Sequence, residues 1–226
     1  MSLEFKVRQF LKGARYAEPL RTQVWLGAFS PPELARLLTP EMLAECKETN
    51  PYRWLTETVA RTSQAPADWL NRLCYQYIHS YLAEDILVKV DRASMAASLE
   101  VRCPFLDVRL TDYVAALPPT CKQRRGTSKF LLKQVMRSKL PPRVADRTKK
   151  GFGIPVAKWL KGELRELMQD KLSAATLKRH HLFNPGYVQE LISEHTQGVR
   201  NHRKLLWNLL MFVLWAERFG PWKEGN

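Results

Sequence analysis

Apolar and polar residues along this chain recur mainly at helical spacing and rarely alternate over more than four positions. Ser30-Pro31-Pro32-Glu33 predicts a helix start with a capping box, because a hydroxyl precedes proline and a carboxylate follows three residues later. Thr39-Pro40, Asn50-Pro51 and Asn184-Pro185 repeat the cap-then-proline signal. We expect helices to begin near residues 31, 40, 51, 67, 85, 107, 128, 155, 185 and 202.

Two of these helices carry most of the expected core. The helix from about residue 155 has a 3.6-residue apolar stripe, with Lys and Glu on its other face. The stripe comprises Val156, Trp159, Leu160, Leu164, Leu167 and Leu172. Nearly every residue from Leu205 to Trp215 is apolar, so this helix should be central in its domain or pack against something outside the chain.

Strand signals are poor. No Asn-Gly or Asp-Gly turn predicts a hairpin. Leu99 to Phe105 is the best extended candidate, because Pro104 disfavours helix at the residue before it. The chain is therefore predicted to be mainly α. With no internal repeat and no low-complexity linker, one domain over residues 1–226 is the simplest expectation.

Membrane and secretory signals are not found in the sequence. No apolar run reaches the roughly 20 residues of a membrane span, and the first residues have no signal-peptide organisation. We therefore expect a soluble cytoplasmic protein. The four cysteines show no CxxC and no paired Cys/His spacing, so they are predicted to be small buried hydrophobes rather than disulfides, and no metal site is expected.

The net charge of +14 is concentrated in one segment. Lys122 to Lys150 contains eleven Lys or Arg residues and one acid, Asp146. Such a field attracts nucleic acid, an anionic surface or the phosphates of a nucleotide. Acidic segments outside the chain would also balance this positive charge, so the charge alone does not identify the partner.

Charged residues that could line a site follow the helix expected from about residue 85. Arg102 can serve as a fork for carboxylate or phosphate, and Asp107 can accept a hydrogen bond from an amine. A buried helix with neutralising ion pairs explains the same spacing. Further along, Thr127 or Ser128 should cap a helix and place Lys129 in its first turn. A lysine is unfavourable there unless an anion bridges it to the helix, although an ordinary solvated lysine fits equally well.

Lys149-Lys150-Gly151-Phe152-Gly153-Ile154-Pro155 predicts a tight entry into the next helix, as a phosphate-contacting loop or as a packed corner. Neither a P-loop nor a dinucleotide-binding fingerprint occurs. Four of the five histidines lie near the C-terminus without a partnered Ser or Cys motif. Nucleophilic catalysis is therefore poorly supported.

Taken together, several ordered motifs resemble the C-terminal half of the synthetase domain of glutamine-dependent asparagine synthetases. The resemblance covers Tyr81 to Leu160 and lies in Ile86–Arg92 with Ser94–Ala96, Leu99–Arg102, Pro104–Asp107, Leu117-Pro118, Lys129 with Leu132-Lys133, Leu140-Pro141, Lys149–Pro155 and Trp159-Leu160. It implies the helical C-terminal portion of an α/β adenine-nucleotide α-hydrolase-like (PP-loop) synthetase domain.

The resemblance also implies a reaction. In that family ATP, with Mg²⁺, adenylates the side-chain carboxylate of aspartate, and ammonia derived from glutamine displaces AMP. Lys129 matches the lysine that contacts the phosphates and stabilises charge during adenylation. Asp107 and Arg102 match the motif that lines the synthetase cleft. The expected catalytic residues are thus Lys129 and Asp107, and the expected nucleotide-binding residues are Lys129 and Arg102.

The sequence departs from the family pattern in three ways. The pyrophosphate loop Ser-Gly-Gly-x-Asp-Ser and the acidic Gly-Glu-Gly-x-Asp-Glu segment do not occur, and residue 2 is Ser rather than the nucleophilic Cys of the glutaminase domain. We therefore expect a C-terminal fragment of the synthetase domain that is inactive by itself and binds no cofactor tightly.

The sequence leaves alternative interpretations open. A basic helical nucleic-acid-binding module would explain the charge, but no recognition helix or exposed aromatic interleaving supports it. A β-lactam-synthetase-like enzyme or another amidotransferase of the same family would share these motifs. A helical scaffold derived from the family, and an oligomeric state, are also open.

Overall fold

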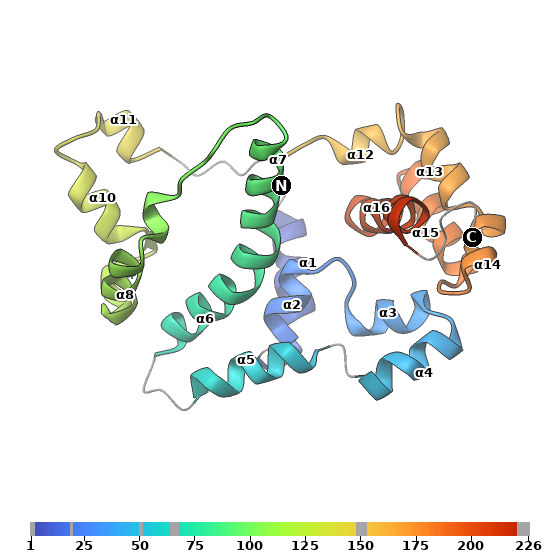
Figure 1. The fold of residues 1–226 in the computed structure, drawn as a ribbon, viewed down its shortest axis with the longest axis horizontal. Coiled ribbons are helices and arrows are strands. Elements are labelled where there is room, and N and C mark those ends of the chain that lie inside the picture. Colours follow the sequence, from blue (N-terminus) through green and yellow to red (C-terminus); the bar gives the residue numbers. More distant parts are fainter. Residues whose placement is uncertain (1–2, 19, 50–51, 64–67, 148–152, 221–226) are drawn as a thin grey trace. The chain divides into compact units, whose positions relative to one another are not determined.

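The computed structural model describes residues 3–18, 20–49, 52–63, 68–147 and 153–220 of the chain. Within these ranges the regular structure is almost entirely helical, with one short antiparallel hairpin (Figure 1). The prediction of a mainly α chain is confirmed. The chain divides into two compact units: unit 1 is Met1–Arg53 with Phe152–Asn226, and unit 2 is Trp54–Gly151. The single domain expected over residues 1–226 stays a prediction.

Unit 1 is built from helices at both ends of the chain. They are α1 (Leu3–Ala14), α2 (Leu20–Leu26), α3 (Pro31–Leu37), α4 (Pro40–Thr49), α12 (Val156–Trp159), α13 (Arg165–Lys171), α14 (Ala174–His180), α15 (Pro185–Gln197) and α16 (Arg203–Phe219). The predicted capping box is present at α3, where the Ser30 N–H donates to the Glu33 carboxylate at 2.7 Å. The starts predicted near residues 31, 40, 155, 185 and 202 each lie within one residue of a helix start in this unit.

Helix α16 is the centre of the unit 1 core and packs against α12, α13 and α15 (Figure 1). Its side chains Leu206, Leu210 and Val213 are completely buried. The opposite face is not covered within the described residues, since Trp215 is 54% exposed and Phe219 is 66% exposed. The prediction of a central helix is therefore correct for one face of α16 only.

The amphipathic helix predicted from residue 155 is not continuous. Helix α12 ends at Trp159 and α13 begins at Arg165, with a turn between them. This turn shifts the helical phase, so Leu160 and Leu172 are buried as predicted, whereas Leu167 faces outward and Met168 takes its place in the core. A stripe read with one fixed period cannot detect such a shift.

Unit 2 is a chain of short elements. After α5 (Arg53–Ser63) come α6 (Trp69–Tyr77), the π-helix η1 (Ile78–Leu87), α7 (Val88–Met95), the 3-10 helix η2 (Pro104–Leu106), α8 (Val108–Ala116), α9 (Pro119–Lys122), β1 (Gln123–Arg124), β2 (Thr127–Ser128), α10 (Phe130–Met136) and α11 (Pro142–Ala145). Instead of separate helices from about 67 and 85, the chain is helical without interruption from Trp69 to Met95. The extended candidate at Leu99 to Phe105 forms no strand.

Unit 2 has almost no buried side chains. Among its described residues only Leu55 and Gln76 are buried, and none from residue 77 to residue 147 is. Large apolar side chains such as Phe105, Val108 and Tyr113 are more than 60% exposed. Folded domains normally bury such residues together, so this exposure is unusual for a folded unit.

The cysteines differ from the prediction. All four lie in described segments as free thiols, and none is buried, so the prediction that they are buried is wrong. Cys103 is exposed, because it lies on the irregular segment between α7 and η2. No helix in the described part of the chain is long and apolar enough to cross a membrane.

Candidate functional site

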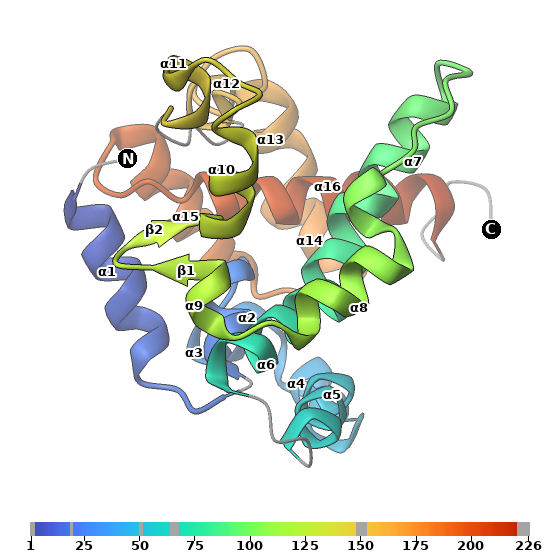
Figure 2. The ribbon, with the colours of Figure 1, turned by 90° about the vertical axis from the view of Figure 1, so that its left-hand side faces the viewer.

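Lys129 follows a β-hairpin that the sequence did not predict. Strands β1 and β2 pair antiparallel, with Arg124 opposite Thr127, and Arg125 and Gly126 form the connection (Figure 2). Both connecting residues have positive φ, at 47° and 78°. That combination is the type I′ turn, which matches the twist of two short strands. Because the sequence has Arg-Gly where Asn-Gly is usual, the hairpin carries no standard sequence signal.

The backbone of Lys129 is itself in the left-handed region, with φ 56° and ψ 37°. Thr127 and Ser128 belong to β2, so the predicted cap is wrong: Lys129 occupies the N-cap position of α10, and its exposed side chain precedes the first turn. For a residue with a Cβ atom this conformation costs about 1–2 kcal/mol. Such strain persists only where the surrounding structure imposes it, and it is often found at functional positions.

The base of the hairpin is tied to other parts of unit 2 by Lys122, the last residue of α9. Its ammonium group donates to the side-chain oxygen of Asn71 in α6 and, at 3.1 Å, to the carbonyl of Ala115 in α8. The backbone N–H of Asn71 in turn donates to the carboxylate of Asp68, the N-cap of α6, at 3.0 Å. The hairpin that carries Lys129 is therefore anchored to two helices.

Arg102 lies on the irregular segment after α7. Ser98, in the left-handed conformation at φ 55°, turns the chain out of that helix. The Arg102 guanidinium forms an ion pair with Glu100, and its side chain is 87% exposed. An ion pair this exposed contributes little stability, so it can exchange readily for another anion. A surface hollow of about 560 Å³ is lined by Asp91, Ser94, Met95, Ser98, Glu100, Val101 and Arg102.

Asp107 has a structural task of its own. It is the N-cap of α8, and its carboxylate accepts a hydrogen bond from the Leu110 N–H at 3.2 Å. Arg109 lies beside it, with Nε 3.8 Å from the carboxylate. One cap bond leaves most of the acceptor capacity of a carboxylate unused, so the same group can also accept from an amine.

The three predicted site residues therefore lie on separate segments of unit 2: Arg102 after α7, Asp107 at the start of α8 and Lys129 at the start of α10. Asp107 and Lys129 are outside the hollow that contains Arg102, and Figure 2 shows the end of α7 and the β1–β2 hairpin well apart. Their predicted roles are neither confirmed nor contradicted by this arrangement. Of the predicted Lys149–Pro155 loop, Lys149 to Phe152 lie outside the described residues, whereas Ile154 is exposed just before α12.

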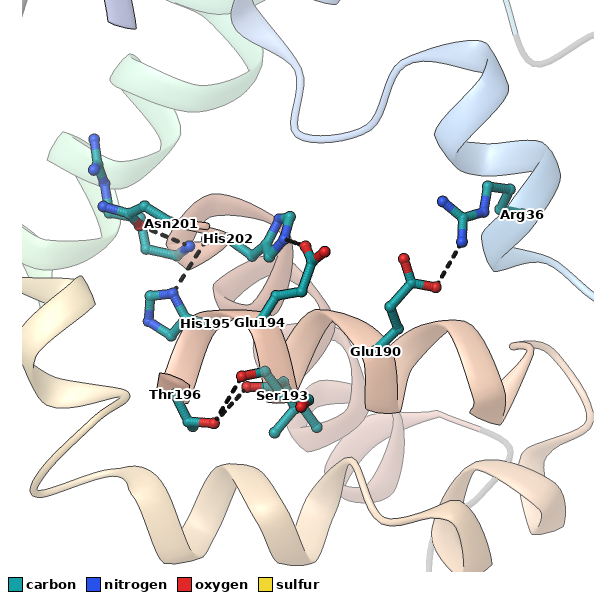
Figure 3. Close-up of polar contacts among 10 residues, drawn as sticks. Arg36, Glu190, Ser193, Glu194, His195, Thr196, Asn201 and His202 are labelled. Carbon is teal, nitrogen blue, oxygen red and sulfur yellow. Dashed lines mark hydrogen bonds and ion pairs between the residues drawn. The ribbon is translucent and has the colours of Figure 1, made fainter. Parts of the chain in front are cut away.

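Unit 1 contains a polar cluster that the sequence did not reveal (Figure 3). The Arg36 guanidinium in α3 donates to Glu190 in α15 at 2.6 Å and lies 4.2 Å from the centre of the Tyr187 ring. The ring of His202 meets Glu194 at 2.5 Å, and this hydrogen bond lowers the pKa of the Glu194 carboxyl. These residues line a surface hollow of about 270 Å³. Because their charges pair with one another, the cluster joins helices rather than presenting open groups.

His195 is the buried member of this region. It is completely inaccessible, and its Nδ1 accepts a hydrogen bond from the backbone N–H of His202 at 3.1 Å (Figure 3). Burial lowers the pKa of its imidazole, which favours the neutral form of the ring. One sequence signal points to this burial: His195 is four residues after Leu191, on the buried stripe of α15.

The described residues include a strongly basic segment but no cluster of metal-ligating side chains. From Lys122 to Arg147 the largely exposed chain carries nine Lys or Arg residues, which suits phosphate groups. No group of three His, Cys, Asp or Glu side chains able to hold a metal is found in the described part of the chain. The segment therefore supplies positive charges suited to the phosphates of a nucleotide. No set of side chains arranged to coordinate Mg²⁺ is found among the described residues.

Comparison with known proteins supports the resemblance. The family model described as Asparagine synthase matches residues 6–217. Glutamine-hydrolysing asparagine synthetase 1 of Bacillus subtilis (strain 168) is 33% identical over 172 residues, which are 75% of this chain and 27% of that protein. Glutamine-hydrolysing asparagine synthetase of Mesocricetus auratus is 32% identical over 123 residues, covering 48% of this chain and 22% of that protein.

An amidase of Gibberella zeae is 25% identical over 159 residues, which are 65% of this chain and 23% of that protein. No solved structure matches the chain. The chain thus spans about a quarter of the length of the curated relatives it matches. Its helical architecture agrees with the predicted helical portion of a PP-loop synthetase domain. With the family model covering residues 6–217, the chain belongs to the asparagine synthase family, a family of ligases.

Proposed function

We propose that this chain provides the helical C-terminal wall of an ATP-dependent amide-forming site, with Lys129 as its charge-stabilising residue. The observation that carries the proposal is the backbone of Lys129: the hairpin and α10 hold it in a left-handed conformation that costs free energy. The exposed lysine belongs to a strongly basic segment, and the role proposed for it is the one that the family resemblance implies.

In the complete enzyme, ATP would supply the activation of a carboxylate, with AMP and pyrophosphate as leaving groups. Lys129 would stabilise the negative charge that develops on the phosphates, which is the type of interaction that contributes most to such reactions. Arg102 would exchange Glu100 for a substrate carboxylate or phosphate, and Asp107 would accept a hydrogen bond from an amine while still capping α8.

The substrates proposed for the complete enzyme are aspartate, ATP with Mg²⁺, and ammonia derived from glutamine. Asparagine synthetases of Bacillus subtilis and Mesocricetus auratus support this choice. The relative in Gibberella zeae is named an amidase, which is a different activity. Within the amide-forming reaction class, the alternative is another carboxylate acceptor.

We also propose that the chain alone does not catalyse the reaction. Its 226 residues contain neither Ser-Gly-Gly-x-Asp-Ser nor Gly-Glu-Gly-x-Asp-Glu, so the family's pyrophosphate loop and its acidic segment are not supplied. The described residues from 77 to 147 also bury no side chain, so the candidate site residues are open to solvent in this chain. Charge stabilisation of this kind is strongest where water is excluded.

The test is ATP–pyrophosphate exchange in the complete enzyme, in which the chain is joined to the part of the domain that carries the pyrophosphate loop. Lys129→Ala should lower exchange about 100-fold or more, as removal of one charge-stabilising donor does elsewhere. Lys139→Ala, which removes an exposed lysine of the same segment, is the matched control and should change exchange less than about twofold.

The 226-residue chain assayed alone should give no exchange above background. Unimpaired exchange in Lys129→Ala would refute the role proposed for this lysine. Exchange by the chain alone would refute the second proposal.

A further inference from the structure

The helix from Trp69 to Met95 changes its geometry in the middle, although its ribbon runs on without a break (Figure 1). The central ten residues, Ile78–Leu87, form the π-helix η1, whereas α6 before it and α7 after it are α-helices. A π-helix closes its hydrogen bonds from residue i to residue i+5 and is mostly limited to a single turn. A π segment of this length is therefore an unusual feature of unit 2.

The usual causes of a change in helix geometry do not explain η1. Neither Pro nor Gly occurs between Trp69 and Met95, and no side chain of η1 is buried, so packing within the chain does not impose the wider turn. One local contact marks the start of the segment, where the Ser80 hydroxyl donates to the Gln76 carbonyl at 2.5 Å. A hydroxyl bonded to the carbonyl four residues earlier competes with the backbone N–H for that acceptor. This contact therefore favours a departure from α geometry.

The apolar residues of the helix fit an unbroken α-helix. With about 3.6 residues per turn throughout, one set of them would fall on a single narrow stripe. The set comprises Leu70, Cys74, Tyr77, Tyr81, Val88 and Met95. Each turn of η1 takes up about one residue more, so α7 is rotated by about half a turn from that arrangement. Val88 and Met95 consequently fall on the side of the helix opposite to Leu70.

Helix α7 forms one wall of the hollow that contains Arg102. Its residues Asp91, Ser94 and Met95 line this hollow. No side chain of α7 is buried, and Met95 is 57% exposed, so packing within the chain does not fix the rotation of α7 about its axis. A rotation by about half a turn would replace these three side chains in the wall by those of the opposite face of α7.

We propose that η1 is a conformational switch that sets the rotation of α7: it is π-helical in this chain and becomes α-helical in the complete enzyme. The conversion aligns the apolar stripe along the whole helix, so that one continuous face can pack against the part of the enzyme outside this chain. Such packing shifts the equilibrium because only the α form presents that face. The switch itself does not depend on the proposed function, but a role of the turned wall in substrate binding rests on it.

A pair of histidines that chelates a metal ion can distinguish the two geometries. His79 is exposed in η1. The residue five positions later, Glu84, lies about one turn away on the same side of a π-helix but on a different side of an α-helix. Glu84→His therefore creates a Ni²⁺ site that requires the π form. Ala83→His is the matched control, because two histidines four residues apart share one side of an α-helix and stay close in a π-helix.

The measurement is the Ni²⁺ affinity of each variant by calorimetry, in the chain and in the complete enzyme, with the unsubstituted protein as the baseline. Both variants should bind Ni²⁺ with similar affinity in the chain. In the complete enzyme Glu84→His should bind at least about tenfold more weakly than in the chain, whereas Ala83→His should change less than about twofold. Ser80→Ala, added to Glu84→His in the chain, should weaken binding about threefold because the competing hydroxyl is lost.

Equal Ni²⁺ affinities of Glu84→His in the chain and in the complete enzyme would overturn the inference. So would a Glu84→His chain that binds Ni²⁺ no better than the unsubstituted chain. An unchanged affinity on adding Ser80→Ala would refute the role of the hydroxyl. Because this readout needs no catalysis, it is separate from the exchange assay: normal exchange by Lys129→Ala removes the proposed role of that lysine and leaves the switch intact.

Discussion

The environments of Lys129 and His195 depend on where the fold places their backbones more than on the residues next to them in the sequence. Lys129 combines a charged side chain with a left-handed backbone, and the conformation follows from the end of a two-residue strand rather than from a cap. His195 shows the reverse case. A residue type usually associated with catalysis lies on the buried stripe of α15, where it satisfies a backbone N–H at the start of α16.

The burial of His195 predicts a pH dependence of stability. Its pKa is lowered by burial first, and the positive charge of Lys161 lowers it further. The unfolded chain therefore takes up a proton before the folded chain does, so stability is fully present above about pH 6.5 and decreases as the pH falls below it. Protonation of Nδ1 would also remove the acceptor for the His202 N–H.

The measurement is the thermal unfolding midpoint at about pH 7.5 and about pH 5.5, on either side of the ordinary histidine pKa, for the chain and for His195→Gln. Glutamine keeps an acceptor but does not titrate, so the midpoint should fall less in the variant. His180, whose pKa burial also lowers, titrates in both proteins, so the difference between them isolates His195. An identical fall in both proteins would contradict the assignment.

At the scale of elements, the paired helices α1 and α2 depend on one glycine. Gly13, near the end of α1, is buried, and a Cβ atom placed there would overlap the indole ring of Trp25 in α2. The indole also donates from Nε1 to the Phe10 carbonyl at 3.3 Å and stacks on the Phe10 ring. The close approach of the two helices therefore requires a residue without a side chain.

Gly13→Ala should destabilise the chain by about 1–3 kcal/mol, because overpacking a fitted contact forces the ring or the backbone to move. The usual gain of about 1 kcal/mol for replacing glycine by alanine within a helix should thus be reversed. Gly162→Ala is the control, since a Cβ there meets only the Lys158 carbonyl at 3.4 Å. Urea unfolding followed by tryptophan fluorescence measures both, and a Gly13→Ala variant as stable as Gly162→Ala would contradict the packing argument.

Much of the element pattern was predictable because its signals are local. Caps followed by proline located α3, α4 and α15, and each of these starts within one residue of its predicted position. The hairpin was not predictable by the same route, because Arg125 is a poor residue for a type I′ turn and both strands have two residues. For the site, Lys129 could be singled out from motif and charge. Its left-handed backbone depends on tertiary geometry and leaves no periodic signal.

At the scale of the whole molecule, the two units differ in how their side chains are buried. Unit 1 joins both ends of the chain through a continuous apolar core, whereas the described residues of unit 2 bury only Leu55 and Gln76. Local opening costs little free energy where few apolar contacts must be broken. Most of the basic residues described in unit 2 are also exposed, which makes them accessible to trypsin.

Limited trypsin digestion should therefore cut first between Lys122 and Arg147, well before any cut in α15 or α16. Mass spectrometry at successive times gives the order of the cuts. The two ends of unit 1 should remain together on gel filtration after these cuts, because α3 and α15 are joined by the Arg36–Glu190 pair and by the Leu38–Phe183 bridge. Early cuts in α16, or separation of the two pieces, would contradict this division of stability.

The Leu38–Phe183 bridge has a consequence for the order in which the protein forms on the ribosome. Beside it, the Thr39 hydroxyl donates to the carbonyl of His181, 142 residues further along the chain. At ordinary translation speeds the partner is synthesised on the order of ten seconds later. During that interval α3 and α4 have left the ribosome, but the C-terminal part of unit 1 that packs against them has not. All of unit 2 is also synthesised before that part. Unit 2 lies between the two parts of unit 1 in the sequence. The core of unit 1 can therefore close only after unit 2 has been synthesised.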